Sequence, residues 1–304
     1  MTTTQEAFDS KPFECGDRSF TRQLLDPAGS HGISAEIGYL KPQDERPFNY
    51  MFEPPSGIPW QNCEYEQPCM PILDARRFEV PPSLSCDGFE LRDAPTRDVD
   101  FSDEASIVRN YYPDAAELAL SATCGTKAYV FDHLVRRREP GRPALSFGRS
   151  GDGSRPAGVG RAHNDYTEAS GRRRFAVVLH DTAPLASVGR FCIVNIWRPL
   201  NGPVLDTPLA LCDARTIAVH DLVASDVYYP NRAGEIYLVH YSVRHAWRYF
   251  SAMNNDEALV FKQYDSQLNG TSRFTPHAAF DHPHTPPDAS LRRSIEVRCL
   301  VTFD

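Results

Sequence analysis

The sequence of 304 residues contains no apolar run that approaches the ~20 residues needed to span a bilayer. Its start, residues 1–14, is polar and acidic, and it lacks both the basic and the apolar segment of a secretory signal. We therefore expect no membrane segment and no export, and the predicted location is the cytoplasm.

Basic residues are too few for a nucleic-acid-binding face. The chain has 32 basic and 40 acidic side chains, which gives a formal net charge of −8. Proteins that bind nucleic acid normally present a basic surface to the phosphates. We therefore expect no nucleic-acid partner.

No two cysteines form a CxxC pair, so neither a zinc ribbon nor a redox motif is supported. In a chain without an export signal we expect reduced thiols, most of them buried. The eight scattered cysteines are Cys15, Cys63, Cys69, Cys86, Cys124, Cys192, Cys212 and Cys299.

Proline is abundant, with 25 residues where a usual share of ~5% would give far fewer. Such frequent breaks disfavour a helical bundle or a coiled coil. Because 41% of the residues are hydrophobic and 24% are charged, the composition is that of a folded chain with a buried core.

The chain divides into two parts by pattern. Residues 1–104 read as an arm of turns and short strands, such as 34–39, packed on a core formed by residues 105–304. Apolar residues near helical spacing predict one or two helices over 105–138, interrupted at Pro113 and Gly125. The Gly-, Ser- and Arg-rich stretch 146–160 is interpreted as a mobile loop that could cover a site.

Short apolar runs separated by Pro, Gly, Asn and Asp dominate the chain after Arg174. This pattern favours an antiparallel sandwich or barrel, and eight strands in two sheets would form a jelly roll. The predicted fold is therefore mainly β with flanking helices. The expected strands are 191–197, 208–212, 216–219, 235–241, 245–250, 258–264, 274–280 and 294–303.

Three short motifs could carry chemistry. His163 and Asp165 share one face of an extended segment, so both could bind one metal ion. His277, at the end of a late strand, could supply a third ligand. Arg292 and Ser294 open the last strand, where a guanidinium and a hydroxyl could hold a carboxylate.

Each motif alone is weak, but their ordered combination is specific. Two imidazoles and one carboxylate on a β scaffold form the facial triad of non-haem Fe(II) oxygenases, which leaves open coordination positions. Two of these positions would take 2-oxoglutarate and one would take O2. The remote carboxylate of 2-oxoglutarate then needs a cation, and Arg292 is the candidate.

From about residue 105 to its end, the chain resembles the fungal and bacterial hydroxylase/desaturase family. That family includes the gibberellin GA4 desaturase, the asperfuranone- and cercosporin-pathway oxygenases and proteins related to cephamycin 7α-methoxylation. The resemblance implies a double-stranded β-helix and an Fe(II)/2-oxoglutarate-dependent dioxygenase that oxidises a small secondary metabolite. It is carried by AHNDYT (162–167), NIWRPL (195–200), PLALCDA (208–214), RHAWRYF (244–250), DEALVFKQYDS (256–266), RFTPHAAFDHP (273–283) and RRSIEVR (292–298).

The third ligand has an alternative at this point. His245 could replace His277, with Lys262 as the carboxylate clamp. We favour His277 because the Arg-x-Ser pair follows it at a suitable interval. His245 and Trp247 would then line the substrate pocket or pack the barrel.

Further side chains have expected roles beside the ligands. Asn195 could donate a hydrogen bond to the metal-proximal carboxylate of 2-oxoglutarate. Tyr166, next to a ligand, is expected near the substrate. Arg198 is expected to pair with the buried Asp213.

Two other functions fit the same residues. One is a jelly-roll binding or assembly protein of a biosynthetic pathway without turnover, and the other is a zinc hydrolase with the same ligands. The sequence leaves open the identity of the substrate and the choice between hydroxylation, desaturation and oxidative cyclisation. It also leaves open the oligomeric state, and a homodimer is one possible assembly.

Overall fold

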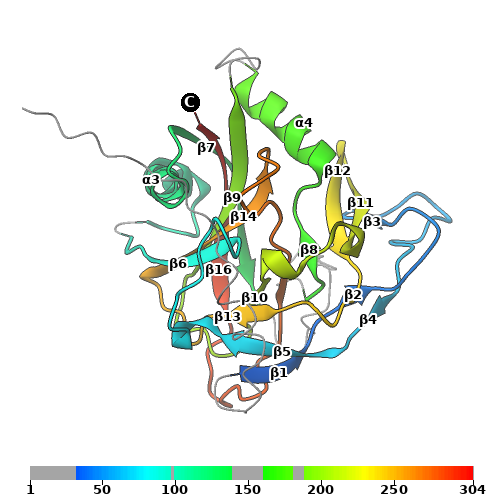
Figure 1. Ribbon diagram of the computed structural model, residues 1–304, viewed down its shortest axis with the longest axis horizontal. Helices are drawn as coiled ribbons and strands as arrows, with labels where there is room; N and C mark the ends of the chain where they lie inside the picture. The colour runs from blue at the N-terminus through cyan, green and yellow to red at the C-terminus, as the bar shows by residue number, and fades with distance from the viewer. Residues whose placement is uncertain (1–31, 97–98, 139–159, 181–187, 304) are drawn as a thin grey trace, which may run out of the picture.

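Two β-sheets form the centre of the molecule, and helices lie beside them (Figure 1). The structure is a computed structural model that describes residues 32–96, 99–138, 160–180 and 188–303. The large sheet has the strand order β1-β5-β13-β10-β15-β8-β12-β11-β3, and the small sheet has the order β6-β14-β9-β16-β7. Strands β2 and β4 form a separate pair.

The strands of the large sheet are β1 (Gly32–Glu36), β3 (Phe48–Tyr50), β5 (Cys69–Asp74), β8 (His163–Asn164), β10 (Leu209–Cys212), β11 (Leu222–Tyr229), β12 (Arg232–Val239), β13 (Trp247–Tyr249) and β15 (His277–Ala279). Those of the small sheet are β6 (Phe89–Asp93), β7 (Lys127–Arg137), β9 (Arg190–Pro199), β14 (Glu257–Asp265) and β16 (Arg293–Phe303). The remaining elements are β2 (Tyr39–Leu40), β4 (Tyr65–Glu66), η1 (Ala75–Arg77), α2 (Glu104–Ser106), η2 (Ile107–Tyr111), α3 (Tyr112–Thr123), α4 (Glu168–Leu179), η4 (Ala214–Thr216) and η5 (Val219–Asp221).

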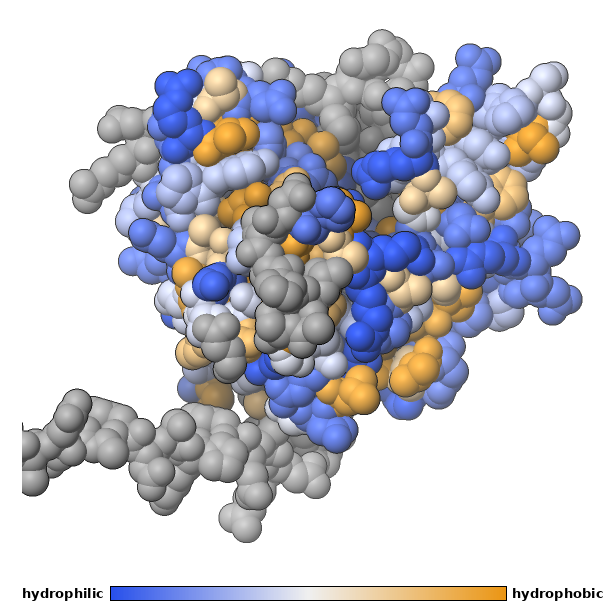
Figure 2. All heavy atoms as spheres, turned by 90° about the horizontal axis from the view of Figure 1, so that it is seen from above, coloured by the Kyte–Doolittle hydropathy of each residue, from blue (hydrophilic) through white to orange (hydrophobic). Residues whose placement is uncertain are grey.

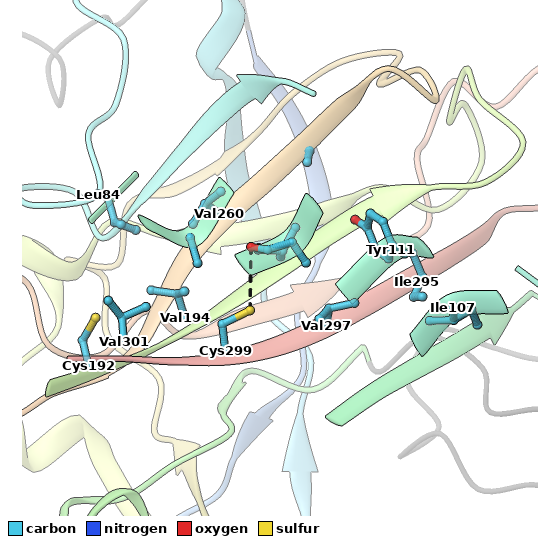
Figure 3. Packing of buried hydrophobic residues seen from close by; sticks show 14 residues of the cluster. Leu84, Ile107, Tyr111, Cys192, Val194, Val260, Ile295, Val297, Cys299 and Val301 are labelled. Carbon is cyan, nitrogen blue, oxygen red and sulfur yellow. Dashed lines mark hydrogen bonds between the residues drawn. The ribbon is translucent and has the colours of Figure 1, made fainter. Parts of the chain in front are cut away.

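The small sheet is buried on both faces. On β9, Val194 and Ile196 point to one face, where they share a buried cluster with Val297 of β16 and Ala119 of α3. Figure 3 shows Val194 and Val297 in this cluster. Alternate residues point to the opposite face because side chains alternate along a strand. This burial on both faces explains why most residues of β9 are apolar, without the alternation of a half-exposed strand.

The second face of the small sheet packs against the large sheet. Trp197 and Phe261 from the small sheet share one buried cluster with Leu209 and Leu211 from β10 of the large sheet. The two sheets therefore form a sandwich, as the spacing of the apolar runs predicts.

Elements before residue 104 join both sheets. Strand β5 pairs with β13 in the large sheet, and β6 pairs with β14 in the small one. Residues 1–31 of the predicted arm and most of the predicted loop 146–160 lie outside the described residues.

The prediction of helices over 105–138 is only half right. The helical part ends at Thr123, where Cys124 takes a left-handed conformation with φ 56°. The rest is strand β7, which pairs with β16 from Lys127 to Arg137. Residues 127–137 form a strand because they pair with β16, which is distant in the sequence. The spacing of their apolar residues does not reveal this pairing.

Other differences from the predicted strands are local. Residues 216–219, expected as a strand, lie in and between the 3-10 turns η4 and η5. Strands β8 and β11 were not predicted. Arg198 does not pair with Asp213, because it points to the helix side, where it donates to Tyr111 and to the carbonyl of Ala94. Asp213 pairs instead with Arg215.

The surface carries scattered apolar residues. On the face seen in Figure 2, hydrophobic residues are interspersed with hydrophilic ones, which is normal for a protein surface. Among the helices within the described ranges, none is long and apolar enough to cross a membrane.

Candidate metal centre

Three predicted ligands meet on the inner face of the large sheet. His163 on β8 lies directly opposite His277 on β15, and their ring centroids are 4.3 Å apart. Asp165 follows β8, and its Oδ1 lies 3.6 Å from Nε2 of His163. One ligand atom from each of the three residues lies within 4.8 Å of the others. The structure thus brings His277 to the His163–Asp165 pair, from which it is distant in the sequence.

The segment that carries His163 and Asp165 is fixed by the helix that follows it. Thr167 caps α4 by accepting a hydrogen bond from the backbone N–H of Ser170, and Ser170 Oγ accepts one from the N–H of Thr167. Gly171 allows α4 to lie close to β14, because a Cβ there would approach the ring of Tyr264 to 2.7 Å. The turn between β8 and α4 therefore has a defined position.

Asn164, between the two ligands, connects three segments. Its Nδ2 donates to the carbonyls of Tyr166 and Gln263, at 2.7 and 2.8 Å, and its Oδ1 accepts from the N–H of Thr275 at 3.0 Å. The side chain is completely buried. It thereby ties β8 to β14 and to the segment that leads into His277. This role could not be predicted from the sequence, because two of the three partners, Gln263 and Thr275, are distant in the chain.

Both histidines are oriented in the same way. Nδ1 of His163 lies 2.8 Å from the carbonyl oxygen of Arg161, and Nδ1 of His277 lies 3.4 Å from that of Thr275. A carbonyl only accepts, so each Nδ1 carries the proton and Nε2 has the lone pair. Burial lowers the pKa of both imidazoles to about 4, so both are neutral at pH 7. Neutral imidazole is the form that binds a metal ion.

Asp165 is held by donors on one of its two oxygens. Oδ2 accepts from Asn195 Nδ2 at 2.9 Å and from Arg298 Nε at 3.0 Å, and the backbone N–H of Asp165 donates to Gln263 Oε1. Burial alone would raise the pKa of Asp165, but the Arg298 cation holds it below its usual range. The residue is a carboxylate at neutral pH. Asn195 thus donates to Asp165, and its predicted hydrogen bond to 2-oxoglutarate stays a prediction.

Arg298 lies between three carboxylates. Its guanidinium also donates to Glu296 Oε1 at 2.7 Å and to Asp132 Oδ2 at 2.8 Å. Sequence reasoning missed its link to Asp165, although a signal existed. Glu296 and Arg298 follow Ser294 at intervals of two residues on the last strand, so their side chains lie on the same face as this residue of the predicted clamp.

Arg292 and Ser294 present unused polar atoms in a buried space. Nε of Arg292 and Oγ of Ser294 are buried and have no hydrogen-bond partner among the described residues. The backbone N–H of Arg292 donates to Asp206, and its Nη1 donates to the carbonyl of Thr207. Burial lowers the pKa of Arg292 to about 10, so it remains a cation. A buried cation and a hydroxyl without partners fit a carboxylate ligand.

His245 and Trp247 lie away from this cluster. Trp247 is paired with Cys212 and His277 with Leu211, and successive residues of β10 point to opposite faces. Trp247 and His277 therefore lie on opposite faces of the large sheet.

His245 and Lys262, the alternative ligand and the alternative clamp, have other hydrogen-bond partners. His245 contacts Tyr39 and Asp221, and Lys262 donates to Asp265 and Thr271. The structure therefore brings neither His245 nor Lys262 to His163 and Asp165.

Tyr166 is buried one residue beyond Asp165. It belongs to an apolar cluster with Ile193 and Leu300 and makes an edge contact with Phe131. Burial raises its pKa to about 12, so the phenol is neutral. The proximity of Tyr166 to a substrate stays a prediction.

Comparisons with known proteins identify the family of the chain. A family model described as "Oxidoreductase/YMDC permease-like domain" matches residues 37–302. The hydroxylase/desaturase CTB9 of Cercospora beticola is 28% identical over 333 residues, which cover 100% of this chain and 97% of the relative. The alpha-ketoglutarate-dependent dioxygenase phiK of a fungal species is 32% identical over 228 residues, which cover 72% and 79%.

A solved structure is also similar. The iron and alpha-ketoglutarate-dependent endoperoxidase NvfI superimposes with a TM-score of 0.78 at 26% identity, covering 90% of this chain and 99% of that one. The predicted jelly-roll fold and the predicted family are thereby confirmed. The chain belongs to the oxidoreductase family that includes these fungal hydroxylase/desaturases and Fe(II)/2-oxoglutarate-dependent dioxygenases.

Proposed function

We propose that His163, Asp165 and His277 hold Fe(II) in this Fe(II)/2-oxoglutarate-dependent dioxygenase of secondary metabolism. The observation that carries the proposal is the approach of three ligand atoms to within 4.8 Å of one another. Both imidazoles are neutral, and Asp165 is ionised. Two histidines and one carboxylate are the donor set of non-haem Fe(II) sites, in which positions remain open for cosubstrate and O2.

Arg292 and Ser294 are proposed to hold the C5 carboxylate of 2-oxoglutarate. The support is the pair of buried donors, Arg292 Nε and Ser294 Oγ, that lack a partner among the described residues. A carboxylate would satisfy both and neutralise the buried cation, which is otherwise costly. Asn195 is assigned to orient Asp165.

Bound Fe(II) supplies the O2-dependent chemistry, in which 2-oxoglutarate becomes succinate and CO2 while the substrate is oxidised. The chain contributes position and environment. The two imidazoles are oriented by the carbonyls of Arg161 and Thr275. Tyr166 and its apolar neighbours exclude water on the side next to Asp165. The substrate is proposed to be a small secondary metabolite, with Tyr166 as a candidate residue of its pocket.

The test separates this function from its two alternatives. Purified protein is mixed anaerobically with Fe(II) and 2-oxoglutarate, which should give a weak visible metal-to-ligand absorption band. Succinate should then form when O2 and extracts of candidate metabolites are added, and H163A should show neither signal. A protein without the band and without succinate would be the non-catalytic binding protein. Hydrolysis supported by Zn(II) and not by Fe(II) would indicate the zinc hydrolase.

The mass of the product distinguishes the reactions that remain open. Hydroxylation adds one oxygen atom, whereas desaturation and oxidative ring closure remove two hydrogen atoms. The last two are separated by reduction of the product, because only a new double bond takes up hydrogen.

Location and assembly are further proposals. The seven cysteines within the described residues are free, which favours a reducing compartment such as the cytoplasm. A fluorescent fusion imaged in cells would test this location. A homodimer is proposed as the assembly, and light scattering coupled to size exclusion would measure the mass in solution.

A further inference from the structure

We propose that Arg298 is a positioning residue that locks the Asp165 carboxylate, so that only Oδ1 is presented to the metal. The inference rests on the proposed iron site and adds a residue that determines its affinity and its number of open positions. Arg298 uses every nitrogen of its guanidinium for this purpose. Nε donates to Asp165, Nη1 to Asp132 and Nη2 to Glu296.

The two oxygens of Asp165 have different surroundings. Oδ2 accepts two hydrogen bonds, from Arg298 at 3.0 Å and from Asn195 at 2.9 Å. Oδ1 faces Nε2 of His163 at 3.6 Å. A metal that also bound Oδ2 would have to compete with both donors. The carboxylate is therefore arranged to bind through one oxygen, which leaves one more coordination position for cosubstrate or O2.

The sheet places the two donors side by side. Arg298 on β16 is the direct cross-strand partner of Asn195 on β9. Both side chains therefore emerge on the same face at one level of the sandwich, opposite Asp165. Arg292, directly before β16, and Ser294 on β16 precede Arg298 at intervals of two residues. The start of β16 therefore brings the proposed cosubstrate clamp and the lock on the metal ligand to one face.

The planar fork of arginine is needed for this arrangement. Asp165 and Glu296 are two largely buried carboxylates, and Arg298 separates them while bonding both. A lysine would bring the same charge but only a single nitrogen. Arg298→Lys thus keeps the positive charge but removes the planar guanidinium. It therefore separates the effect of charge from the effect of hydrogen-bond geometry.

Co(II) is a suitable probe because its visible absorption weakens as its coordination number rises. Wild type and H163A are titrated first. If wild type binds no Co(II), or if H163A binds it as well as wild type does, the proposed metal site is wrong. The proposed role of Arg298 in positioning a metal ligand is then wrong as well. With the metal site established, R298K is expected to bind Co(II) ~10–100-fold more weakly, the range typical for residues that orient a metal ligand. Its absorption per bound Co(II) should also fall, because Oδ2 becomes available to the metal.

Arg190 provides a matched control. It also forms a two-pronged ion pair with a buried carboxylate, Asp265, on the same sheet. R190K should therefore lose comparable packing while its Co(II) affinity stays within about twofold of wild type. A loss in R190K as large as that in R298K would mean that general loosening of the sheet explains the effect, and the lock would be rejected.

A second variant keeps the test decisive if R298K does not fold. N195S removes the other donor to Oδ2 without removing a buried charge. It should weaken Co(II) binding and lower the absorption in the same direction as R298K. Unchanged affinity and absorption in R298K, or in N195S where R298K is unfolded, would overturn the proposal.

Discussion

His163 and His277 face each other across neighbouring antiparallel strands, and each ring is turned by the backbone carbonyl two residues before it. The same local geometry therefore appears twice in one site. It presents both Nε2 atoms to a common space next to Asp165. The backbone of the two strands therefore sets the orientation of both rings.

The third ligand can be tested with two buried histidines. H277Q should weaken Fe(II) binding by more than the ~10–100-fold that is typical of residues that only orient a ligand. H245Q should leave Fe(II) affinity unchanged, because His245 contacts Tyr39 and Asp221 on the other face of the sheet. It should cost ~1–3 kcal/mol of stability by leaving these partners unpaired. Equilibrium dialysis and urea unfolding measure the two quantities, and the reverse pattern would make His245 the ligand.

The cosubstrate clamp predicts separate effects on binding and stability. R292M should weaken 2-oxoglutarate binding about tenfold to a hundredfold, since a charge-assisted hydrogen bond contributes ~1.5–3 kcal/mol. S294A should weaken it by up to about tenfold. Stability without cosubstrate should change by less than about 1 kcal/mol in R292M, because Met keeps the stem and removes a buried cation whose Nε has no partner among the described residues.

Titration of the visible band with 2-oxoglutarate gives the affinity. If R292M binds 2-oxoglutarate as wild type does, the clamp belongs to another cation on the inner face, such as Arg136, the cross-strand partner of Ser294.

Gly171 predicts a packing defect that reaches the metal segment. In G171A the new methyl group would meet the ring of Tyr264 at 2.7 Å, so α4 or the ring must shift. Overpacking of this kind costs ~1–3 kcal/mol. Thermal unfolding should show a lower Tm than wild type. A169G, at an exposed position of the same helix, is the control for the effect of helix propensity alone.

The metal-free protein should lose stability as the pH falls from about 6.5 to about 4. The pKa of His163 and His277 is about 4 in the folded state, against ~6.5 in an unfolded chain. The unfolded state therefore binds more protons in this interval, and the free energy of unfolding decreases by up to ~1.4 kcal/mol per pH unit for each histidine. The lowered pKa of Asp165 acts only below this interval, since its usual value is 3.8.

Urea unfolding in the presence of a chelator at several pH values measures this slope. The double variant H163Q/H277Q should show a flatter dependence between pH 6.5 and 4. A slope as steep as that of wild type would mean that other groups cause the loss.

Local motifs made the ligands predictable, whereas long-range pairing limited the rest. The HxD pair and the Arg-x-Ser pair are each set by alternation along one strand, which a sequence displays directly. The choice between His277 and His245 depends on which face of the large sheet each side chain occupies. That face is set by the register of β15 and β13 against β10. Strand β7 and the partners of Arg298 were missed for a related reason, because both depend on segments that are distant in the chain.

Asn164 couples the metal site to the completion of the fold. Its amide spans from β8 to Gln263 and to the segment before His277, so the imidazoles come together only when strands from both ends of the domain have docked. An unfolded chain has no such pocket, and iron loading must come after folding. Iron then acts as a ligand of the native state alone and shifts the folding equilibrium by mass action. Cells short of iron should accordingly hold a less durable form of this enzyme, cleared more readily by proteases.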